Sequence, residues 1–347
     1  MSQRFTRRES FALAAGAAAL AAPPVLAAEP EVTLRLHQFL PLTSFVPAHI
    51  LTPWIKAVEE ASQGRVRIQH YPSMQLGGKP TDLIDQVTDG VVDIVWTLPG
   101  YTPGRFPRTE VMELPFLVAE AEAASAALWE LAQAEMVDTD FRDIHLLGTW
   151  VHGPGVIHAN KSVRAIPDFE GLKLRGPSRV TTKLLEHFGA TAVEMPVPAV
   201  PEALSHGTID GALLPWEVSA SLRIGELVHH HTQFAGPSIY TASFILAMNK
   251  DRYAALDPDL QAAIDSVSGV EFSAQAGHLQ QAEDIPSRQA AMDLGNEIIT
   301  IPAEDTSIWK DASQPVIDAW VAEMEENGVP GETLLSSARA LIEKHSF

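Results

Sequence analysis

The sequence predicts an α/β fold of two similar lobes with a cleft between them. Three observations lead to this prediction: strands alternate with helices near the N-terminal end, the same order of elements returns between residues 172 and 210, and the chain beyond residue 240 is mostly helical. Strands joined by helices in this way form parallel-type sheets that helices cover. The length of 347 residues fits two domains at roughly 150 residues each.

The first half predicts three strands and two helices. Residues 32–36 alternate like a strand, and apolar residues recur at helical spacing over residues 47–62. A glycine ends that helix, and residues 65–69 form the second strand. A second helix over residues 80–88 leads to a short buried strand at 93–96.

The second half repeats this order. It predicts a strand at 172–175, a helix at 180–188, a strand at 192–195 and a helix at 198–205. The ends of the two halves correspond as well, because residues 87–93 and 204–210 both run from a helix through a glycine to an aspartate that starts a strand.

The shared order of four elements favours two lobes of one design. Chance convergence of a common helix–glycine–strand pattern is the alternative.

The C-terminal third predicts one strand followed by helices. An apolar strand lies within residues 240–249, helix covers most of 259–295 with a break near Pro286, and two more helices cover 311–326 and 332–345. No low-complexity linker separates the lobes, so we expect the chain to cross between them more than once. The ligand cleft should then lie beyond the carboxyl ends of the strands.

The N-terminal segment predicts export from the cytoplasm. Arg4, Arg7 and Arg8 precede an apolar run over residues 11–22, and cleavage is expected after Ala27 or Ala28. The arginine pair resembles a twin-arginine signal, with a general secretory signal as the alternative. The apolar run is too short for a permanent membrane anchor. The mature protein is therefore expected in the periplasm.

The predicted domain organisation follows from these elements. Residues 1–28 form the export signal, residues 29–152 and 241–280 form lobe I, and residues 153–240 and 281–347 form lobe II.

Composition excludes several classes of function. Lys and Arg number 24 against 44 Asp and Glu, and the net charge of −20 repels nucleic acid. The chain has no cysteine, which excludes a disulfide framework, a thiolate metal site and a cysteine nucleophile.

Seven short segments in the chain resemble, in the same order, the solute-binding proteins of tripartite ATP-independent periplasmic (TRAP) transporters. The segments are Gly64–Ile68 with the following Tyr71–Pro72, Gln75–Gly77, Asp89–Asp93, Glu113–Phe116, Gly171–Arg175, Gly207–Gly211 and Met248–Lys250. The resemblance covers nearly the whole mature chain.

The resemblance implies a periplasmic-binding-protein fold similar to type II, with a central cleft and crossing segments that include a long helix. It implies lobes that close over a small organic acid and deliver it to the subunits of a membrane permease, which the protein contacts only peripherally. We expect no cofactor and no enzymatic activity.

Arg175 is the residue that the resemblance assigns to the ligand. In family members, the arginine that ends the matching strand grips the ligand carboxylate. A guanidinium can form two parallel charge-assisted bonds to a carboxylate. The alternative for an arginine taken alone is a strand-end residue that pairs with a surface acid.

Two departures from the family pattern bear on the ligand. Many relatives carry an arginine where this chain has Val156, and an asparagine where it has Leu214. A sugar acid or a dicarboxylate would leave polar groups unpaired there, at roughly 1–3 kcal/mol each. A monocarboxylate with an apolar or aromatic body is therefore expected.

Further residues after the predicted strands are candidates for the pocket wall. Aromatic residues suit a flat apolar ligand, although core packing is their alternative role. Glu217 is a candidate acceptor for a ligand hydroxyl, or it stabilises the first turn of a helix. The other candidates are Phe39, Trp96, Tyr101, Trp150, His152 and Trp216.

Two other classes of function remain as alternatives. A periplasmic enzyme acting on a carboxylic acid would need acid and base groups, but the acidic clusters at 82–93 and 138–143 come with no second motif that assigns these roles. A periplasmic metal carrier would use His229–His231. Adjacent residues point in different directions, so such a run rarely supplies three ligands to one ion.

Overall fold

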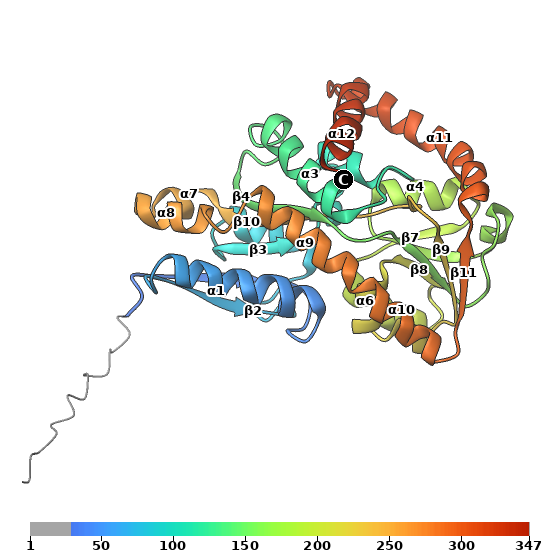
Figure 1. Cartoon of the computed structure of the whole chain (residues 1–347), viewed down its shortest axis with the longest axis horizontal. Coiled ribbons are helices and arrows are strands. Elements are labelled where there is room, and N and C mark those ends of the chain that lie inside the picture. The colour runs from blue at the N-terminus through green and yellow to red at the C-terminus, as the bar shows by residue number, and fades with distance from the viewer. Residues whose placement is uncertain (1–28, 347) are drawn as a thin grey trace, which may run out of the picture.

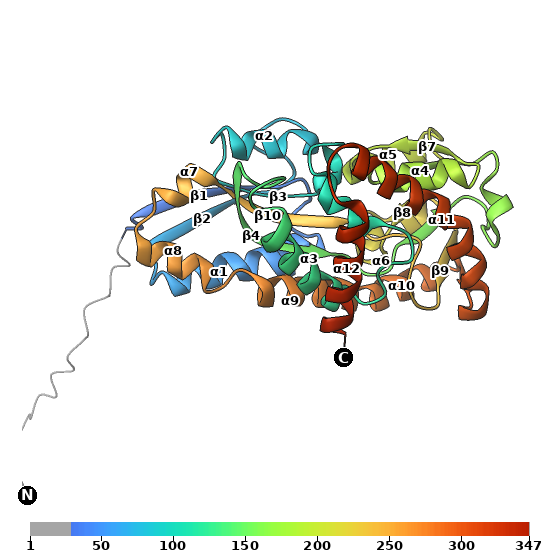
Figure 2. The same cartoon turned by 90° about the horizontal axis from the view of Figure 1, so that it is seen from above.

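The computed structural model describes residues 29–346 and contains two sheets side by side (Figures 1 and 2). The predicted export signal at residues 1–28 lies outside the described residues. Within them, no helix combines the length and the apolar character that a membrane crossing needs.

The first sheet has five strands in the order β2-β1-β3-β10-β4. Strand β1 runs parallel to β2 and β3, whereas β10 is antiparallel to β3 and β4. The strands are β1 (Val32–His37), β2 (Val66–Tyr71), β3 (Ile94–Thr97), β4 (Ile144–Val151) and β10 (Ser243–Asn249).

The second sheet has six strands in the order β11-β9-β5-β8-β6-β7. Strand β6 runs parallel to β7 and β8, and β5 is antiparallel to β8 and β9. The strands are β5 (Val156–Ala159), β6 (Lys173–Gly176), β7 (Thr191–Glu194), β8 (Gly211–Leu214), β9 (His230–Phe234) and β11 (Glu297–Ile301).

Helices cover both sheets and join them (Figure 2). They are α1 (Thr52–Ala61), α2 (Leu83–Thr88), α3 (Ala121–Glu135), α4 (Arg179–His187), α5 (Val200–Ser205), α6 (Trp216–Ser221), α7 (Lys250–Ala254), α8 (Pro258–Asp265), α9 (Val270–Ala282), α10 (Asp284–Asp293), α11 (Ala303–Glu326) and α12 (Gly331–His345). Helix α9 packs on α3 and β4 of the first lobe, and α10 packs on α6 of the second. Together α9 and α10 form the expected helical crossing between the lobes.

The two lobes repeat one set of hydrogen bonds. The Asp93 carboxylate accepts from the backbone N–H of Arg35 at 2.7 Å, and the Asp210 carboxylate accepts from the backbone N–H of Lys173 at 2.8 Å. Each aspartate N–H donates back to the carbonyl oxygen of the same partner, at 3.1 and 2.7 Å. The aspartates therefore join the first and third strands of each half in the same way.

The glycines that precede these aspartates also match. Gly90 has φ +71° and Gly207 has φ +66°, values that a residue without Cβ adopts most readily. The predicted two-lobe α/β fold is confirmed, and the correspondence between the halves is more than chance convergence.

Several elements differ from the sequence prediction. Strands β4, β5, β9 and β11 and helix α3 were not predicted; β4 and β5 are buried on both faces, so their sequences show no alternation. The helical region beyond Asp259 breaks between α8 and α9 and again at Glu283. Pro286 lies in the first turn of α10, where its missing N–H costs no hydrogen bond.

Candidate ligand-binding site

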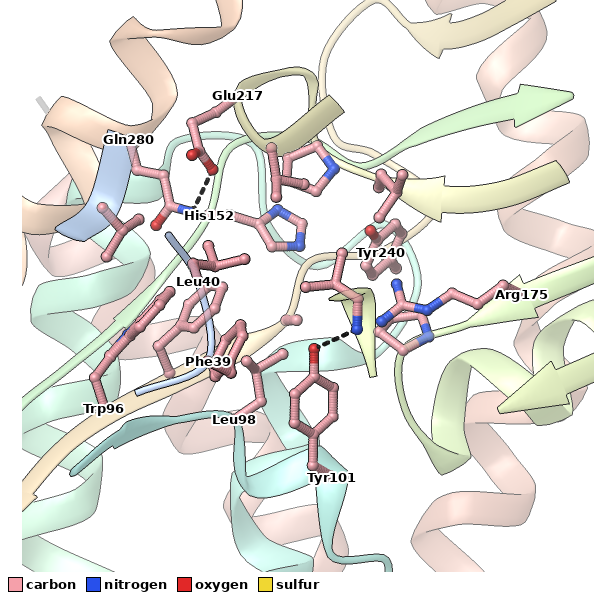
Figure 3. A pocket seen from close by; sticks show the side chains of 18 residues that line it. Phe39, Leu40, Trp96, Leu98, Tyr101, His152, Arg175, Glu217, Tyr240 and Gln280 are labelled. Atoms are coloured by element: carbon pink, nitrogen blue, oxygen red, sulfur yellow. Dashed lines mark hydrogen bonds between the residues drawn. The ribbon is translucent and has the colours of Figure 1, made fainter. Parts of the chain in front are cut away.

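A cavity lies between the two lobes (Figure 3). All of its lining residues are buried, so the lobes are closed around it. The lining residues are Phe39, Leu40, Val46, Trp96, Leu98, Tyr101, His152, Arg175, Pro177, Val197, Leu214, Pro215, Glu217, Val218, Tyr240, Ala242, Phe244 and Gln280.

Arg175 is the cationic group of this cavity. It stands on β6, its side chain is 2% exposed, and the guanidinium is fixed from both neighbouring strands: Nε donates to the carbonyl of Met195 and Nη1 to that of Leu213, both at 2.9 Å. A guanidinium has five N–H donors. Within residues 29–346 no carboxylate forms an ion pair with Arg175. The buried charge is therefore available to an anion.

The first lobe supplies an aromatic wall. Phe39 stacks on Trp96 with ring centroids 4.7 Å apart and 17° between planes, and Phe244 lies 5.5 Å from Trp96. Tyr101 meets the edge of Phe39 at 5.7 Å. The Tyr101 hydroxyl accepts from the backbone N–H of Val197 at 2.9 Å, which links the two lobes beside the cavity.

Two polar residues, Glu217 and Gln280, lie across the cavity from Arg175 (Figure 3). Gln280 donates to the Glu217 carboxylate at 2.9 Å. Burial raises the pKa of Glu217 to about 7, against the opposing hydrogen bond from Gln280. Burial lowers the pKa of His152 to about 4, so its ring is neutral at pH 7.

Six of the eight predicted site residues line the cavity: Arg175, Glu217, His152, Phe39, Trp96 and Tyr101. Their contact with the ligand stays a prediction.

Trp150 and Trp216 differ from the expectation that they line the pocket. Trp150 lies behind the aromatic wall, stacked 6.2 Å from Trp96, and its N–H donates to Gln280. Trp216 lies outside the cavity, where its N–H donates to Gln233 at 2.9 Å and its ring packs near His158. Glu217 and Val218 of α6 line the cavity, whereas Trp216 at the start of the same helix faces Gln233 and His158.

Of the two residues that depart from the family pattern, one lines the cavity and the other does not. Leu214 lines the cavity at the end of β8, as the ligand argument requires. Val156 instead packs outside it, in a small cluster with Trp216 and Ala291. Of the two departures, only Leu214 therefore contributes to the apolar lining of the pocket.

Sequence reasoning missed several lining residues. The clearest signal was available for Tyr240 and Phe244, which belong to the apolar segment predicted near residues 240–249. Leu98, Val197 and Gln280 carry no motif of their own.

The side chains of His229, His230 and His231 at the start of β9 have different hydrogen-bond partners and do not converge on one point. His231 points into the second lobe, where its Nδ1 lies 2.7 Å from His158 Nδ1. Burial lowers the pKa of His158 and His231, so both rings are neutral at pH 7. Among residues 29–346 no group of three or more His, Cys, Asp or Glu side chains has the arrangement of a metal site.

Two α/β lobes closed around a cavity with one buried arginine define a solute-binding receptor for a small organic anion. The sequence profile of the family described as "Bacterial extracellular solute-binding protein, family 7" matches residues 44–324. The chain belongs to this family, and the predicted resemblance is confirmed. It is a solute-binding protein of the TRAP class, whose members capture small organic acids and deliver them to a membrane permease.

Solved structures similar to the chain include three with bound aromatic acids. A TRAP solute-binding protein from Rhodoferax ferrireducens T118, in complex with copurified benzoate, is 49% identical, with 90% of this chain and 98% of that chain covered and a TM-score of 0.88. A marine metagenome protein specific for aromatic acids, with 3-hydroxybenzoate, is 41% identical, with coverage of 92% and 100% and a TM-score of 0.89. A Bordetella bronchiseptica protein with bound mandelate is 28% identical, with coverage of 90% and 99% and a TM-score of 0.84.

Proposed function

We propose that this protein is a periplasmic receptor for an aromatic monocarboxylate, which its lobes enclose and hand to the permease. One observation carries the proposal: Arg175 is buried beside an aromatic wall and has no ion-pair partner among residues 29–346. Burying a cation without an anion is costly, and a ligand carboxylate removes that cost.

The two lobes divide the recognition between them. In the aromatic wall, Trp96 and Phe244 stand on strands of the first sheet and Phe39 follows β1 of that sheet, whereas Arg175 stands on β6 of the second sheet. A ligand with a ring and a carboxylate therefore makes both sets of contacts only when the lobes are closed. Differential contact of this kind shifts a hinged protein toward its closed state.

The ligands of the relatives support this class. Benzoate, 3-hydroxybenzoate and mandelate each combine one carboxylate with an aromatic ring, and the first two belong to relatives 49% and 41% identical to this chain.

A dicarboxylate fits the cavity less well. Arg175 is the one arginine or lysine among the lining residues that the structure describes, and Leu214 offers no hydrogen bond. A second carboxylate would find no second cation among these residues: it would lie against apolar side chains or beside the acid Glu217, and leaving a charged group unpaired costs more than about 1–3 kcal/mol.

Export and domain bounds are part of the same proposal. We place signal cleavage near Ala27 and Ala28, with lobe I at 29–152 and 241–280 and lobe II at 153–240 and 281–347. N-terminal sequencing of protein isolated from the periplasm tests the cleavage site. A mature chain that begins elsewhere, or that retains residues 1–28, contradicts it.

A thermal-shift series tests the ligand class. Benzoate at 100 times its dissociation constant is expected to add about 2.7 kcal/mol to the free energy of unfolding, whereas succinate and N-acetylneuraminate at the same concentration add less. A larger shift with succinate than with benzoate would overturn the aromatic monocarboxylate. Mass spectrometry of the released ligand is expected to recover benzoate unchanged, and a product would show that the protein is an enzyme.

A further inference from the structure

Glu217 carries a buried oxygen that the protein leaves without a partner. The residue is 1% exposed, and its Oε1 has no hydrogen-bond partner among the described residues. The other oxygen, Oε2, accepts from Gln280. An unpaired buried oxygen costs free energy, and in a cavity wall a ligand donor can remove that cost.

The orientation of this carboxyl group is fixed by a chain of hydrogen bonds. The Trp150 indole can only donate, and it donates to Gln280 Oε1 at 3.0 Å. The amide of Gln280 must therefore turn its NH₂ group to Glu217 Oε2. Neither Trp150 nor Gln280 is hydrogen-bonded to Glu217 Oε1.

His152 adds a second acceptor to the same cavity. Its Nδ1 lies 2.5 Å from the carbonyl oxygen of Gly153, and a carbonyl only accepts, so Nδ1 carries the proton. In the neutral ring Nε2 is then an acceptor. No described residue donates to this nitrogen, and Figure 3 shows the His152 ring among the lining side chains between Glu217 and Arg175.

We propose that Glu217 and His152 form a second polar subsite, which recognises a hydroxyl group on the ring of the aromatic acid that Arg175 holds. The proposal rests on the proposed function, because the ring must first be positioned by the carboxylate on Arg175. A ring hydroxyl suits the subsite, since it can donate one hydrogen bond and also accept one. With its pKa raised to about 7, Glu217 can act as an acceptor when ionised and as a donor when protonated.

The subsite predicts a preference that the rest of the cavity does not. The aromatic wall and Arg175 treat benzoate and its hydroxyl derivatives alike. A hydrogen bond to a charged group strengthens binding by about tenfold or more. We therefore expect 3-hydroxybenzoate or 4-hydroxybenzoate to bind about tenfold more tightly than benzoate.

Isothermal titration calorimetry of the mature protein with benzoate, 3-hydroxybenzoate and 4-hydroxybenzoate tests this preference. In Glu217→Leu the preference is expected to disappear while benzoate still binds. Glu217→Gln keeps the acceptor for Gln280 and serves if the leucine variant does not fold; its preference is expected to fall.

Glu113 provides the matched control. It is also 1% exposed, its pKa is also raised by burial to about 7, and it also has one unpartnered oxygen, but it does not line the cavity. Glu113→Gln is therefore expected to keep the full hydroxyl preference.

The outcomes separate the two proposals. If neither hydroxybenzoate binds more tightly than benzoate, or if Glu217→Leu and Glu217→Gln keep the wild-type preference, the subsite is refuted and the aromatic receptor remains. If benzoate and both hydroxybenzoates fail to bind while succinate binds, the proposed function itself is refuted.

Discussion

Replacing Arg175 with methionine removes the charge of the cavity and leaves an unbranched side chain in its place. The wild-type guanidinium is held by carbonyl oxygens of Met195 and Leu213 and faces a cavity in which we expect a ligand carboxylate. Removing one partner of a buried charge pair costs about 2–5 kcal/mol, and each 1.4 kcal/mol is a factor of ten in affinity. The dissociation constant for benzoate should therefore rise by roughly 30-fold to 3,000-fold.

Arg175→Lys keeps the charge but loses the planar fork, so its affinity should lie between the wild type and Arg175→Met. The unliganded protein should respond differently. The methionine variant loses the two hydrogen bonds to Met195 and Leu213, but it also removes a buried cation that has no ion-pair partner in the wild type. Its free energy of unfolding is therefore expected to change by less than its free energy of benzoate binding. A larger loss of binding than of stability is expected of an arginine that holds the ligand.

Arg108→Met is the matched control for this experiment. Arg108 lies in the first lobe, outside the cavity lining, and its guanidinium donates to the buried Asp140 carboxylate of the same lobe at 2.6 Å. Its loss should lower the stability and leave the dissociation constant for benzoate unchanged. Titration calorimetry and thermal unfolding measure both quantities. An Arg175→Met variant that binds benzoate as tightly as the wild type refutes the reasoning.

Three further predictions concern the wall, the buried acid and the closure. Phe39→Leu should weaken benzoate binding about twofold to tenfold by calorimetry, because it removes the ring stacked on Trp96. Phe106→Leu, at a residue buried outside the cavity, should leave benzoate binding unchanged. Equal effects of the two substitutions would contradict the role of the aromatic wall in binding. Between pH 4.5 and 7 the folded state holds a proton on Glu217 that the unfolded state has lost, so this residue makes stability fall as pH rises. Denaturant unfolding should therefore show Glu217→Gln gaining about 2–3 kcal/mol relative to wild type from pH 5 to 8, and a constant difference would be inconsistent with a raised pKa. Small-angle scattering should show a smaller radius of gyration with saturating benzoate than without it, and an unchanged radius would count against lobe closure.

The repeated architecture could be predicted because its signals are local. Gly90 and Gly207 mark helix ends, and Asp93 and Asp210 mark strand starts, so each half reveals its own strand–helix order. The chain crossings could not be placed in this way. Buried strands such as β4 have no alternation, and their neighbours in the sheet come from distant parts of the sequence.

The site was predictable where a side chain stands at a strand end. Arg175 ends β6 and Trp96 lies on β3, and both line the cavity. Trp216 was placed in the pocket because it follows β8, but the start of α6 turns its ring away and turns Glu217 inward. The partner of Glu217, Gln280, lies on a crossing helix far along the chain, and no sequence pattern connects the two.

A crystal structure of the mature protein with benzoate tests the central claim most directly. The account predicts the carboxylate within about 3 Å of the Arg175 guanidinium nitrogens, with the ring against Phe39 and Trp96. A benzoate bound outside this cavity, or bound inside it with its carboxylate directed away from Arg175, would contradict the account.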